Sequence, residues 1–361
     1  MARAPLAEAA ACIARLLPAR SLHSSPTSVV LRGDQAGLSV AGADGEVSVQ
    51  VRVPAAVHCD GEVAVPRRVF ADTLAALDTP EVRLAVEGAR LAIRTSGARF
   101  ALPSLDVAAD PGLVVLPPTA GVFAGSVLRS AAAVAGASSH DGALPIFTGV
   151  RITSSGGRLS LVATDRYRMA AATVPWQPAE GADDLATLVP AALVTEICRQ
   201  ASSAETVRVH ASGDRFGLAW DGCTVVATSL AGSFPDRQLA SLLDVQPACV
   251  IEVEADALSA AAQRALPYAG PHSQVALRAA DGLIQVSGRD PLCGESEESV
   301  KASVRGTHLT VLYQVRFLVD ALRPFAGQVL TVRMQAGMRA TAFTAPAGDL
   351  TYLVVPMRDK P

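Results

Sequence analysis

Residues 161–170 read LVATDRYRMA, and the rest of the chain is organised around this stretch. It begins with apolar, β-prone residues and then reaches Thr164 and Asp165, two turn formers that end the apolar run. The pattern predicts a strand that ends at a sheet edge, followed by a tip with two guanidinium groups, one aromatic ring and one thioether. Such a tip suits peptide recognition, because Tyr and Arg are frequent binding anchors and Met adapts its shape. A strand followed by a solvated turn is the alternative that this stretch leaves open.

An internal repeat gives the organisation of the chain. Three helical patterns begin at equal intervals of 124 residues, at Pro66, Pro190 and Gln314. Proline at a first helical position is pre-set for the turn, so the first two copies are good helix starts. An Ala-rich helix is expected earlier in each copy, over residues 6–17, 127–137 and 257–266.

Strand pairs with Gly-bearing turns follow the helices, so every copy has the order helix, strands, helix, strands. The sequence therefore predicts an α+β fold of three similar domains, each with two helices and antiparallel sheet. Proline-marked connections near Pro117 and Pro247 place the domains over residues 1–117, 118–247 and 248–361. A single large mixed domain is the alternative, and the equal spacing argues against it.

Composition bounds the class of protein. The chain has 361 residues and six cysteines, none in a C-x-x-C pair or beside a histidine at zinc-ligand spacing. This cysteine usage indicates reduced thiols in a cytoplasmic protein and no metal site. No apolar run reaches the ~18–20 residues of a membrane-spanning helix. Charged residues interrupt the apolar stretch near the N-terminus, so a secretory signal is not expected.

Sequence motifs of catalysis are missing. The chain contains no phosphate-binding loop and no G-x-S-x-G nucleophile elbow. Acidic clusters at Asp183–Asp184 and at Glu295, Glu297 and Glu298 are interpreted as solvated loops. The sequence therefore favours a binding or scaffold protein without a cofactor over an enzyme. A hydrolase with an unrecognised site is the alternative from another class, and the threefold repeat argues against it.

The formal net charge of −3 argues against a protein that holds DNA tightly through bulk electrostatics, which usually requires a basic domain. A ring that holds DNA by topology stays compatible with this charge, because basic residues then need only line the hole.

The end of the chain carries a second motif, YLVVPMR at residues 352–358. Together with residues 161–170, it resembles the bacterial DNA polymerase III beta subunit family, the DNA sliding clamps. That family carries an Ala-Thr-Asp-x-x-Arg-Leu-like segment in mid-chain and a Met-Pro-x-Arg-like tail, and the resemblance covers nearly the whole chain. It implies three DNA-clamp domains, each with two helices packed on one side of antiparallel sheet. It also implies a head-to-tail homodimer that closes six domains into a ring, with the helices facing the hole.

The resemblance further implies a non-enzymatic processivity factor that encircles duplex DNA and tethers replication and repair proteins. DNA polymerase III alpha, clamp-loader subunits and other proteins with clamp-binding motifs are the implied partners, through segments with Leu-Phe-like ends. Their pocket would lie between the second and third domains, with residues 164–169 as one wall. The residues implied to line it are Phe147, Thr164, Arg166, Tyr167, Arg168, Met169, Pro235, Val354, Val355, Pro356, Met357 and Arg358. Core packing is the alternative for each residue taken singly.

The family's helices also suggest DNA contacts. Arg20 follows the first predicted helix, where the family has a DNA-facing arginine, and other arginines lie on or beside the predicted helices. The arginines expected to face DNA are Arg15, Arg20, Arg67, Arg68, Arg129, Arg199, Arg264, Arg316 and Arg323. Phosphate contacts carry no sequence information, as a sliding ring requires. Ordinary solvated helix faces are the alternative.

Two departures from the family pattern motivate a rival interpretation. The opening strand before the first helix is expected to be missing, because helix signals begin by Pro5. The tail ends in Asp359, Lys360 and Pro361 where many members end in leucine. These departures favour, as the alternative, an actinobacterial second-copy clamp whose altered pocket confers self-resistance to a clamp-targeting peptide antibiotic.

Overall fold

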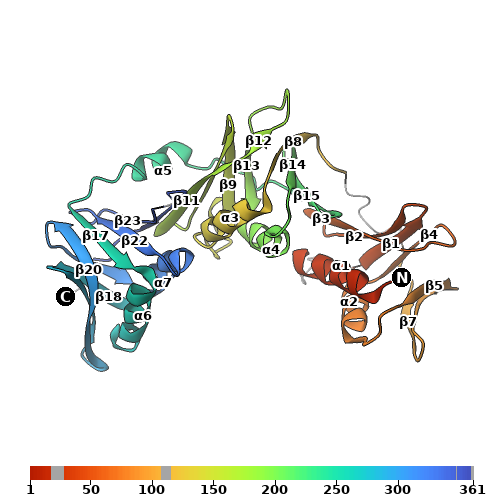
Figure 1. The fold of residues 1–361 in the computed structure, drawn as a ribbon, viewed down its shortest axis with the longest axis horizontal. Helices are drawn as coiled ribbons and strands as arrows, with labels where there is room; N and C mark the ends of the chain where they lie inside the picture. Colours follow the sequence, from red (N-terminus) through yellow and green to blue (C-terminus); the bar gives the residue numbers. More distant parts are fainter. Residues whose placement is uncertain (18–27, 107–114, 347, 359–361) are drawn as a thin grey trace. The chain divides into compact units, whose positions relative to one another are not determined.

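The computed structural model describes residues 1–17, 28–106, 115–346 and 348–358 of the chain. The chain divides into two compact units, in which helices and antiparallel strands alternate (Figure 1). Unit 1 contains residues 1–128, 176–189 and 196–229, and unit 2 contains residues 129–175, 190–195 and 230–361. The elements that contribute residues to both units are α3 (Leu128–Ala135), β13 (Ala186–Pro190) and α4 (Ala191–Ala201).

Unit 1 is built on one nine-stranded and one three-stranded antiparallel sheet. In spatial order, the larger sheet contains β12 (Gln177–Pro178), β8 (Thr119–Phe123), β14 (Val207–Ser212), β15 (Arg215–Trp220), β16 (Cys223–Thr228), β3 (Val47–Val53), β2 (Gly37–Ala43), β1 (Ser28–Asp34) and β4 (Gly61–Pro66). The smaller sheet contains β5 (Arg83–Glu87), β6 (Arg90–Arg94) and β7 (Arg99–Pro103). Its helical elements are α1 (Arg3–Leu16), α2 (Arg67–Ala76) and the 3-10 turn η2 (Gly125–Val127).

The core of unit 1 lies between its first two helices and the sheet. Leu6, Ile13 and Leu17 are spaced by three to four residues or their multiples, so they occupy one face of α1, and all three are buried. That face packs on α2, whose Phe70 and Leu74 are also fully buried, and on β2 and β3. Each such side chain stabilises the fold by roughly 1.5–3 kcal/mol relative to exposure.

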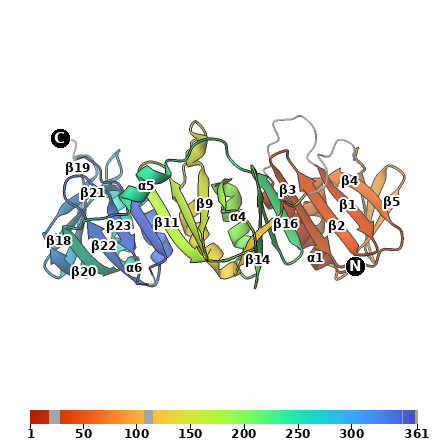
Figure 2. The same cartoon turned by 90° about the horizontal axis from the view of Figure 1, so that it is seen from above.

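Unit 2 contains one continuous run of antiparallel strands. In spatial order these are β9 (Gly149–Ser155), β10 (Arg158–Thr164), β11 (Arg168–Pro175), β24 (Leu350–Val354), β23 (Thr341–Thr344), β22 (Val329–Met334), β17 (Cys249–Glu254), β20 (Gly294–Gly306), β19 (Leu283–Asp290), β18 (Gln274–Ala280) and β21 (Thr310–Gln314). Its helical elements are η3 (Pro145–Phe147), α5 (Asp236–Leu242), α6 (Ala255–Ala265), η4 (Leu266–Tyr268), α7 (Val315–Leu322) and η5 (Arg323–Phe325). Figure 2 shows β9, β11, β23 and β22 in succession across this sheet. Helices α6 and α7 cover one face and α5 lies on the other (Figure 1).

The predicted repeat is confirmed. The helices expected after Pro66, Pro190 and Gln314 begin one residue later, as α2, α4 and α7. The earlier helix of each copy is also present, as α1, α3 and α6, and hairpins follow the helices as the turn residues indicated. The chain therefore has the predicted α+β class, and the two predicted helices are present in each of the three copies.

The first copy differs from the other two at its start. In the second and third copies, β8 and β17 precede the first helix. In the first copy, Ala2 forms a single bridge with Glu81, and the Met1 carbonyl accepts a 3.0 Å hydrogen bond from the Val82 amide. The residues before α1 therefore pair with the segment that leads into β5.

Two elements differ from the sequence-based expectation. Glu295, Glu297 and Glu298 lie in strand β20 and not in a solvated loop. The acidic side chains stay at the surface because two of them form ion pairs, Glu295 with Arg289 and Glu298 with Arg264. Helix α5 was not predicted; its Leu239 packs on the buried side chains of Met169 and Leu353.

A buried ion-pair network fastens strand β11 to helix α7. The side chain of Arg168 is 2% exposed, and its Nε lies 2.9 Å from Asp165 Oδ2 while a terminal nitrogen lies 2.5 Å from Asp320 Oδ2. Burial opposes the charge of Arg168, but Tyr352, Asp320 and Asp165 outweigh it and raise the pKa of this guanidinium. The network supplies both carboxylate partners that a buried guanidinium needs.

We expect the substitution Arg168→Ala to lower the free energy of unfolding by about 3–5 kcal/mol, because it leaves buried carboxylates without their main partner. The matched control is Arg289→Ala, which removes an exposed pair with Glu295 and should cost less than about 1 kcal/mol. Urea denaturation followed by circular dichroism measures both changes. Equal effects of the two substitutions would contradict a buried, interlocked role for Arg168.

Candidate functional site

The two sequence motifs lie side by side in unit 2. Strand β11 pairs antiparallel with β24, with Arg168 opposite Val354 and Met169 opposite Leu353. Beyond the strand ends, the Val355 amide donates a 2.8 Å hydrogen bond to the Tyr167 carbonyl. Segments that are far apart in sequence therefore form one local structure, as their proposed common role requires.

Side-chain hydrogen bonds shape the turn between β10 and β11. Asp165 Oδ1 accepts from the amides of Tyr167 at 3.0 Å and Arg168 at 2.9 Å. Thr164 Oγ1 donates to the Arg168 carbonyl at 2.7 Å and accepts from the Arg166 amide at 3.0 Å. Arg166 has a φ of 79°, in the left-handed region that non-glycine residues rarely adopt. The turn formers of the motif thus hold Arg166 and Tyr167 outward in a fixed, strained conformation.

The side chains of residues 164–169 do not all point the same way. Successive side chains of a strand point to opposite faces, so Arg168 and Met169 lie on different faces of β11. Arg168 faces α7, whereas Met169 is 2% exposed and packs with Ala342 and Leu353 on the other face. Thr164 is buried as well, and its hydroxyl is used by the turn.

The exposed part of the motif is an aromatic surface, which we call the Tyr167 surface. Tyr167 is 55% exposed, and its ring stacks on Phe317 of α7 with centroids 6.0 Å apart. The guanidinium of Arg166 lies 5.9 Å from the Phe147 ring and 6.0 Å from the Tyr167 ring. With Val355, which is 39% exposed, these side chains define the surface. Its residues are Phe147, Arg166, Tyr167, Phe317 and Val355.

The other predicted pocket residues lie around this surface. Met357 is half-buried, and its amide donates a 2.7 Å hydrogen bond to the Leu312 carbonyl of β21. Pro356 and Val354 are buried, Arg358 is exposed, and Pro235 is half-buried at the start of α5.

The sequence interpretation missed two residues, Phe317 and Leu239. Phe317 had a usable signal, because it falls outside the α7 face formed by Val315, Leu318 and Leu322. Leu239 offered no comparable signal, since its role depends on α5, which was not predicted.

The arginines predicted to face DNA divide into three groups. Arg20 lies outside the described residues. Arg67 is only 4% exposed, so its proposed contact with a phosphate is wrong, because α2 begins with this side chain turned into unit 1. The remaining arginines are exposed: Arg15, Arg68, Arg129, Arg199, Arg264, Arg316 and Arg323.

Carboxylates restrain several of the exposed arginines. Buried Glu196 of α4 accepts hydrogen bonds from Arg15 at 3.0 Å, from Arg199 at 3.1 Å and from Gln200 at 2.9 Å. Burial opposes the charge of Glu196, but these hydrogen bonds outweigh it and lower the pKa of the carboxyl. This carboxylate therefore stays ionised and holds two cationic side chains in place.

Residues 1–17, 28–106, 115–346 and 348–358 contain no group of three His, Cys, Asp or Glu side chains that could hold a metal ion. In the same residues, every helix is too short or too polar to cross a membrane.

Known protein families match the chain in three successive segments, one for each copy of the repeat. Models of the DNA polymerase III beta subunit match residues 1–113 for the N-terminal domain, 124–236 for the central domain and 241–358 for the C-terminal domain. The beta sliding clamp of Streptomyces coelicolor is 29% identical over 98% of this chain and 97% of its own length. The beta sliding clamp homolog GriR of Streptomyces muensis is 28% identical over 89% of this chain and 86% of its own.

Solved structures agree with the fold. The DNA polymerase sliding clamp of Bacillus subtilis superposes with a TM-score of 0.91 at 21% identity, over 100% of this chain and 98% of its own. A Pseudomonas aeruginosa sliding clamp bound to griselimycin has a TM-score of 0.91 at 22% identity, over 99% and 98% of the two chains. Because models of all three domains match in succession along its length, this chain belongs to the family of DNA polymerase III beta subunits, the sliding clamps.

Proposed function

We propose that this chain is a DNA sliding clamp, a non-enzymatic processivity factor that encircles duplex DNA and tethers replication and repair proteins. The observation that carries the proposal is the threefold clamp-domain match along the chain, together with relatives that share nearly its full length. We assign the domains to residues 1–117, 118–247 and 248–361 and the site of action to the cytoplasm. DNA polymerase III alpha, clamp-loader subunits and other clamp-binding proteins are the partners.

Topology, and not charge, holds the DNA in this proposal. The formal net charge is −3, and most of the exposed helix arginines are restrained by carboxylates. Arg129 and Arg316 form no ion pair within the described residues and remain available to phosphates. Contacts of this kind are weak one by one and independent of sequence, which permits sliding.

A loading experiment tests this function. On linear duplex, we expect weak binding that falls steeply with salt, because the contacts are few and electrostatic. Once a clamp loader has placed the protein on a circular duplex, it should stay bound until a nuclease linearises the circle. Release from intact circles at the rate seen for linear DNA would contradict encirclement. Gel filtration of the complex before and after linearisation measures retention.

Two free strand edges of opposite charge support a head-to-tail homodimer. Strand β7 is an edge strand of the small sheet, whose strands carry four arginines; Arg94 and Arg99 form ion pairs with Glu87, and Arg83 and Arg90 form none within the described residues. In β20, residues 302–306 pair with β17, whereas residues 294–301 pair only with β19. This open edge carries Glu295, Glu297 and Glu298. An unpaired edge binds another strand readily, and complementary charge fixes which one.

Charge reversal at the acidic edge tests the dimer. Wild-type protein at micromolar concentration should sediment as a dimer of twice 37.1 kDa. Glu297→Arg should raise the dissociation constant at least about tenfold, because it places like charges across the contact. Asp183→Arg, in an exposed loop, is the matched control and should leave the dimer intact. A wild-type monomer at all concentrations, or equal effects of both substitutions, would overturn the proposed contact.

The Tyr167 surface is the proposed docking site for partner peptides. It offers exposed aromatic and aliphatic side chains beside a cationic group, the composition of a binding hot spot. The strained turn at Arg166 and the stack on Phe317 keep these anchors fixed before binding, which lowers the entropy lost on association. Apolar residues at the end of a partner segment would bury the Tyr167 ring and reach toward Met357.

Calorimetric titration with a peptide that ends in Leu-Phe tests this surface. Tyr167→Ala and Met357→Ala should each weaken binding by about 1–3 kcal/mol, as truncation of interface anchors does. The double mutant should be non-additive if one ligand contacts both residues. Leu266→Ala, an exposed leucine in η4, is the matched control and should bind as the wild type does. Unchanged affinity in both single mutants would place the peptide elsewhere.

A second candidate function is a second-copy clamp that resists a clamp-targeting peptide antibiotic. The observation that favours it is that α5 lies over one face of the β11–β24 pair. There, Leu239 of α5 packs on the buried side chains of Met169 and Leu353. Side chains that fill this face leave little apolar surface for a foreign ligand. This candidate is supported if the protein binds griselimycin much more weakly than the Pseudomonas aeruginosa clamp does. A gene located beside a peptide-synthetase cluster would support it as well. Comparable griselimycin affinity, and a gene within a replication-origin cluster, would exclude it.

A further inference from the structure

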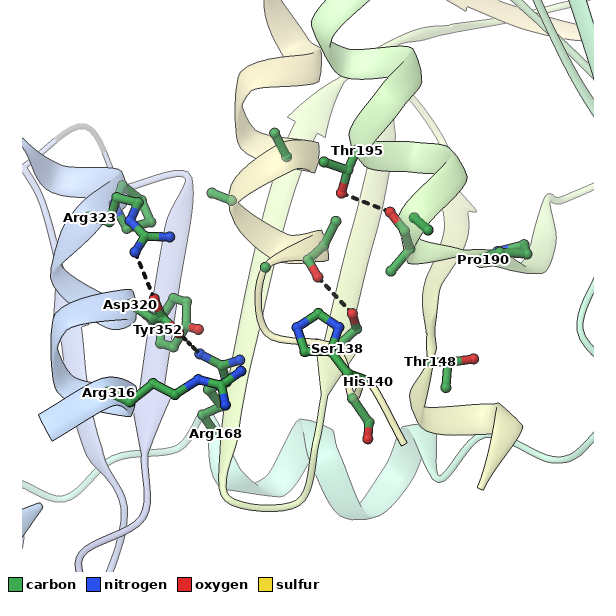
Figure 3. A pocket seen from close by; sticks show the side chains of 18 of the residues that line it. Ser138, His140, Thr148, Arg168, Pro190, Thr195, Arg316, Asp320, Arg323 and Tyr352 are labelled. Atoms are coloured by element: carbon green, nitrogen blue, oxygen red, sulfur yellow. Dashed lines mark hydrogen bonds and ion pairs between the residues drawn. The ribbon is translucent and has the colours of Figure 1, made fainter. Parts of the chain in front are cut away.

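A cavity of about 670 Å³ lies in unit 2, on the helix side of the β11–β24 pair, and its lining does not include the residues of the Tyr167 surface. One wall carries Arg168, Arg316, Asp320, Arg323 and Tyr352 from β11, α7, η5 and β24 (Figure 3). The facing wall comes from α3, the segment after it and the first turn of α4. This volume falls in the range of sites that bind small organic ligands.

The charges on the first wall leave one cation without a partner. Asp320 is shared by Arg168 and by Arg323, whose terminal nitrogen lies 3.0 Å from Asp320 Oδ1. Arg168 also binds Asp165, so these two arginines and two carboxylates balance. Arg316 is exposed and forms no ion pair or hydrogen bond within the described residues. The wall therefore has an excess positive charge located at Arg316.

A buried hydroxyl group on the same wall also lacks a partner. Tyr352 is 1% exposed, and within the described residues its hydroxyl makes no hydrogen bond of standard geometry, although it lies near Arg168. Burial raises the pKa of this phenol, so the group remains an O–H donor. Figure 3 shows Tyr352 near Arg168, and both residues line the cavity together with Arg316. A buried donor without an acceptor is costly, and an acceptor bound in the cavity would remove that cost.

The facing wall leaves room for a ligand. Ala132, Ala133 and Gly136 present almost no side chain, and exposed His140 stands at the rim. Ala191 and Ala192 bring the first turn of α4 to the cavity, where the partial positive charge of a helix start favours an anion. Asp320, the acidic residue of the lining, is paired with both Arg168 and Arg323.

We propose that this cavity binds a phosphate group. Arg316 supplies the unpaired charge, the Tyr352 hydroxyl donates one hydrogen bond, and the remaining N–H groups of Arg168 and Arg323 complete the donor set. Guanidinium groups match the oxygen geometry of a phosphate, and a neutral phenol adds a directional donor. The phosphate belongs either to a free phosphorylated molecule or to the backbone of a DNA strand. A site for a free phosphorylated molecule does not rest on the clamp function, because such a molecule needs neither a ring nor a loader, whereas a site for a backbone phosphate rests on the DNA contacts proposed above.

Calorimetric titration with inorganic pyrophosphate tests the cavity, and a short single-stranded oligodeoxynucleotide forms the second arm. Tyr352→Phe removes only the hydroxyl and Arg316→Gln only the unpaired charge, so both variants should fold. Each should weaken binding roughly 10- to 100-fold, as loss of a hydrogen bond to a charged group does. Arg278→Gln, at an exposed arginine of β18 far from the cavity lining, is the matched control. Thermal melting of all four proteins confirms that they are folded.

The two arms separate the sources of the phosphate. Saturable pyrophosphate binding that both cavity variants weaken and the control retains supports a site for free phosphorylated molecules. If only the oligodeoxynucleotide binds, and both cavity variants weaken that binding while the control retains it, the site takes a backbone phosphate. Failure of the wild type to bind either probe, or equal binding by all variants, would overturn the proposal and would leave the clamp function untouched.

Discussion

The buried contact of Arg168 with Asp165 and Asp320 is the interaction on which the candidate sites of unit 2 depend. It fixes the end of β11 to the turn before it and to helix α7, at the point where β11 pairs with β24. Both segments with clamp-like motifs meet at this point. The buried guanidinium of Arg168 is stabilised by both carboxylates. The turn that carries Asp165 and the helix that carries Asp320 are therefore held against the end of β11.

Because successive side chains of a strand alternate between its two faces, charged and apolar side chains of β11 and β24 lie on opposite sides of the sheet. Arg168 and Tyr352 face the helices and border the cavity, whereas Met169 and Leu353 face α5 and close an apolar cluster. Only the residues beyond the strand ends, such as Tyr167 and Val355, remain exposed for a partner. One strand pair therefore gives a structural contact, a closed apolar face and an open binding surface within a few residues.

The sequence predicted the repeat well, because the helix starts at Pro66 and Pro190 and the Gly-bearing hairpin turns are local signals. The sequence could not predict that Arg67 is buried. A charged residue at the start of a helix is expected to be exposed, and only the tertiary fold buries this one. The helix α5 and the closed face beneath it were missed for a related reason. Leu239 is partly buried only because Met169 and Leu353 happen to lie opposite, and no local pattern encodes that contact. The cavity escaped prediction because its residues come from segments that are far apart in the sequence.

The use of arginine suits a protein that holds DNA by encirclement. Lys301 and Lys360 are the only lysines, so nearly all positive charge resides on guanidinium groups, which hold fixed geometries against carboxylates. Glu196 restrains Arg15 and Arg199, Glu298 restrains Arg264, and Asp320 restrains Arg323. A restrained guanidinium keeps N–H groups free for a passing phosphate, but its field is partly cancelled, so each contact is weak. Strong cationic contacts would slow sliding, so in the proposed function the paired arginines would only guide the duplex and a closed ring would retain it. The unpaired Arg316 is an exception to this pattern, and it stands at the edge of a cavity that contains an unsatisfied hydroxyl.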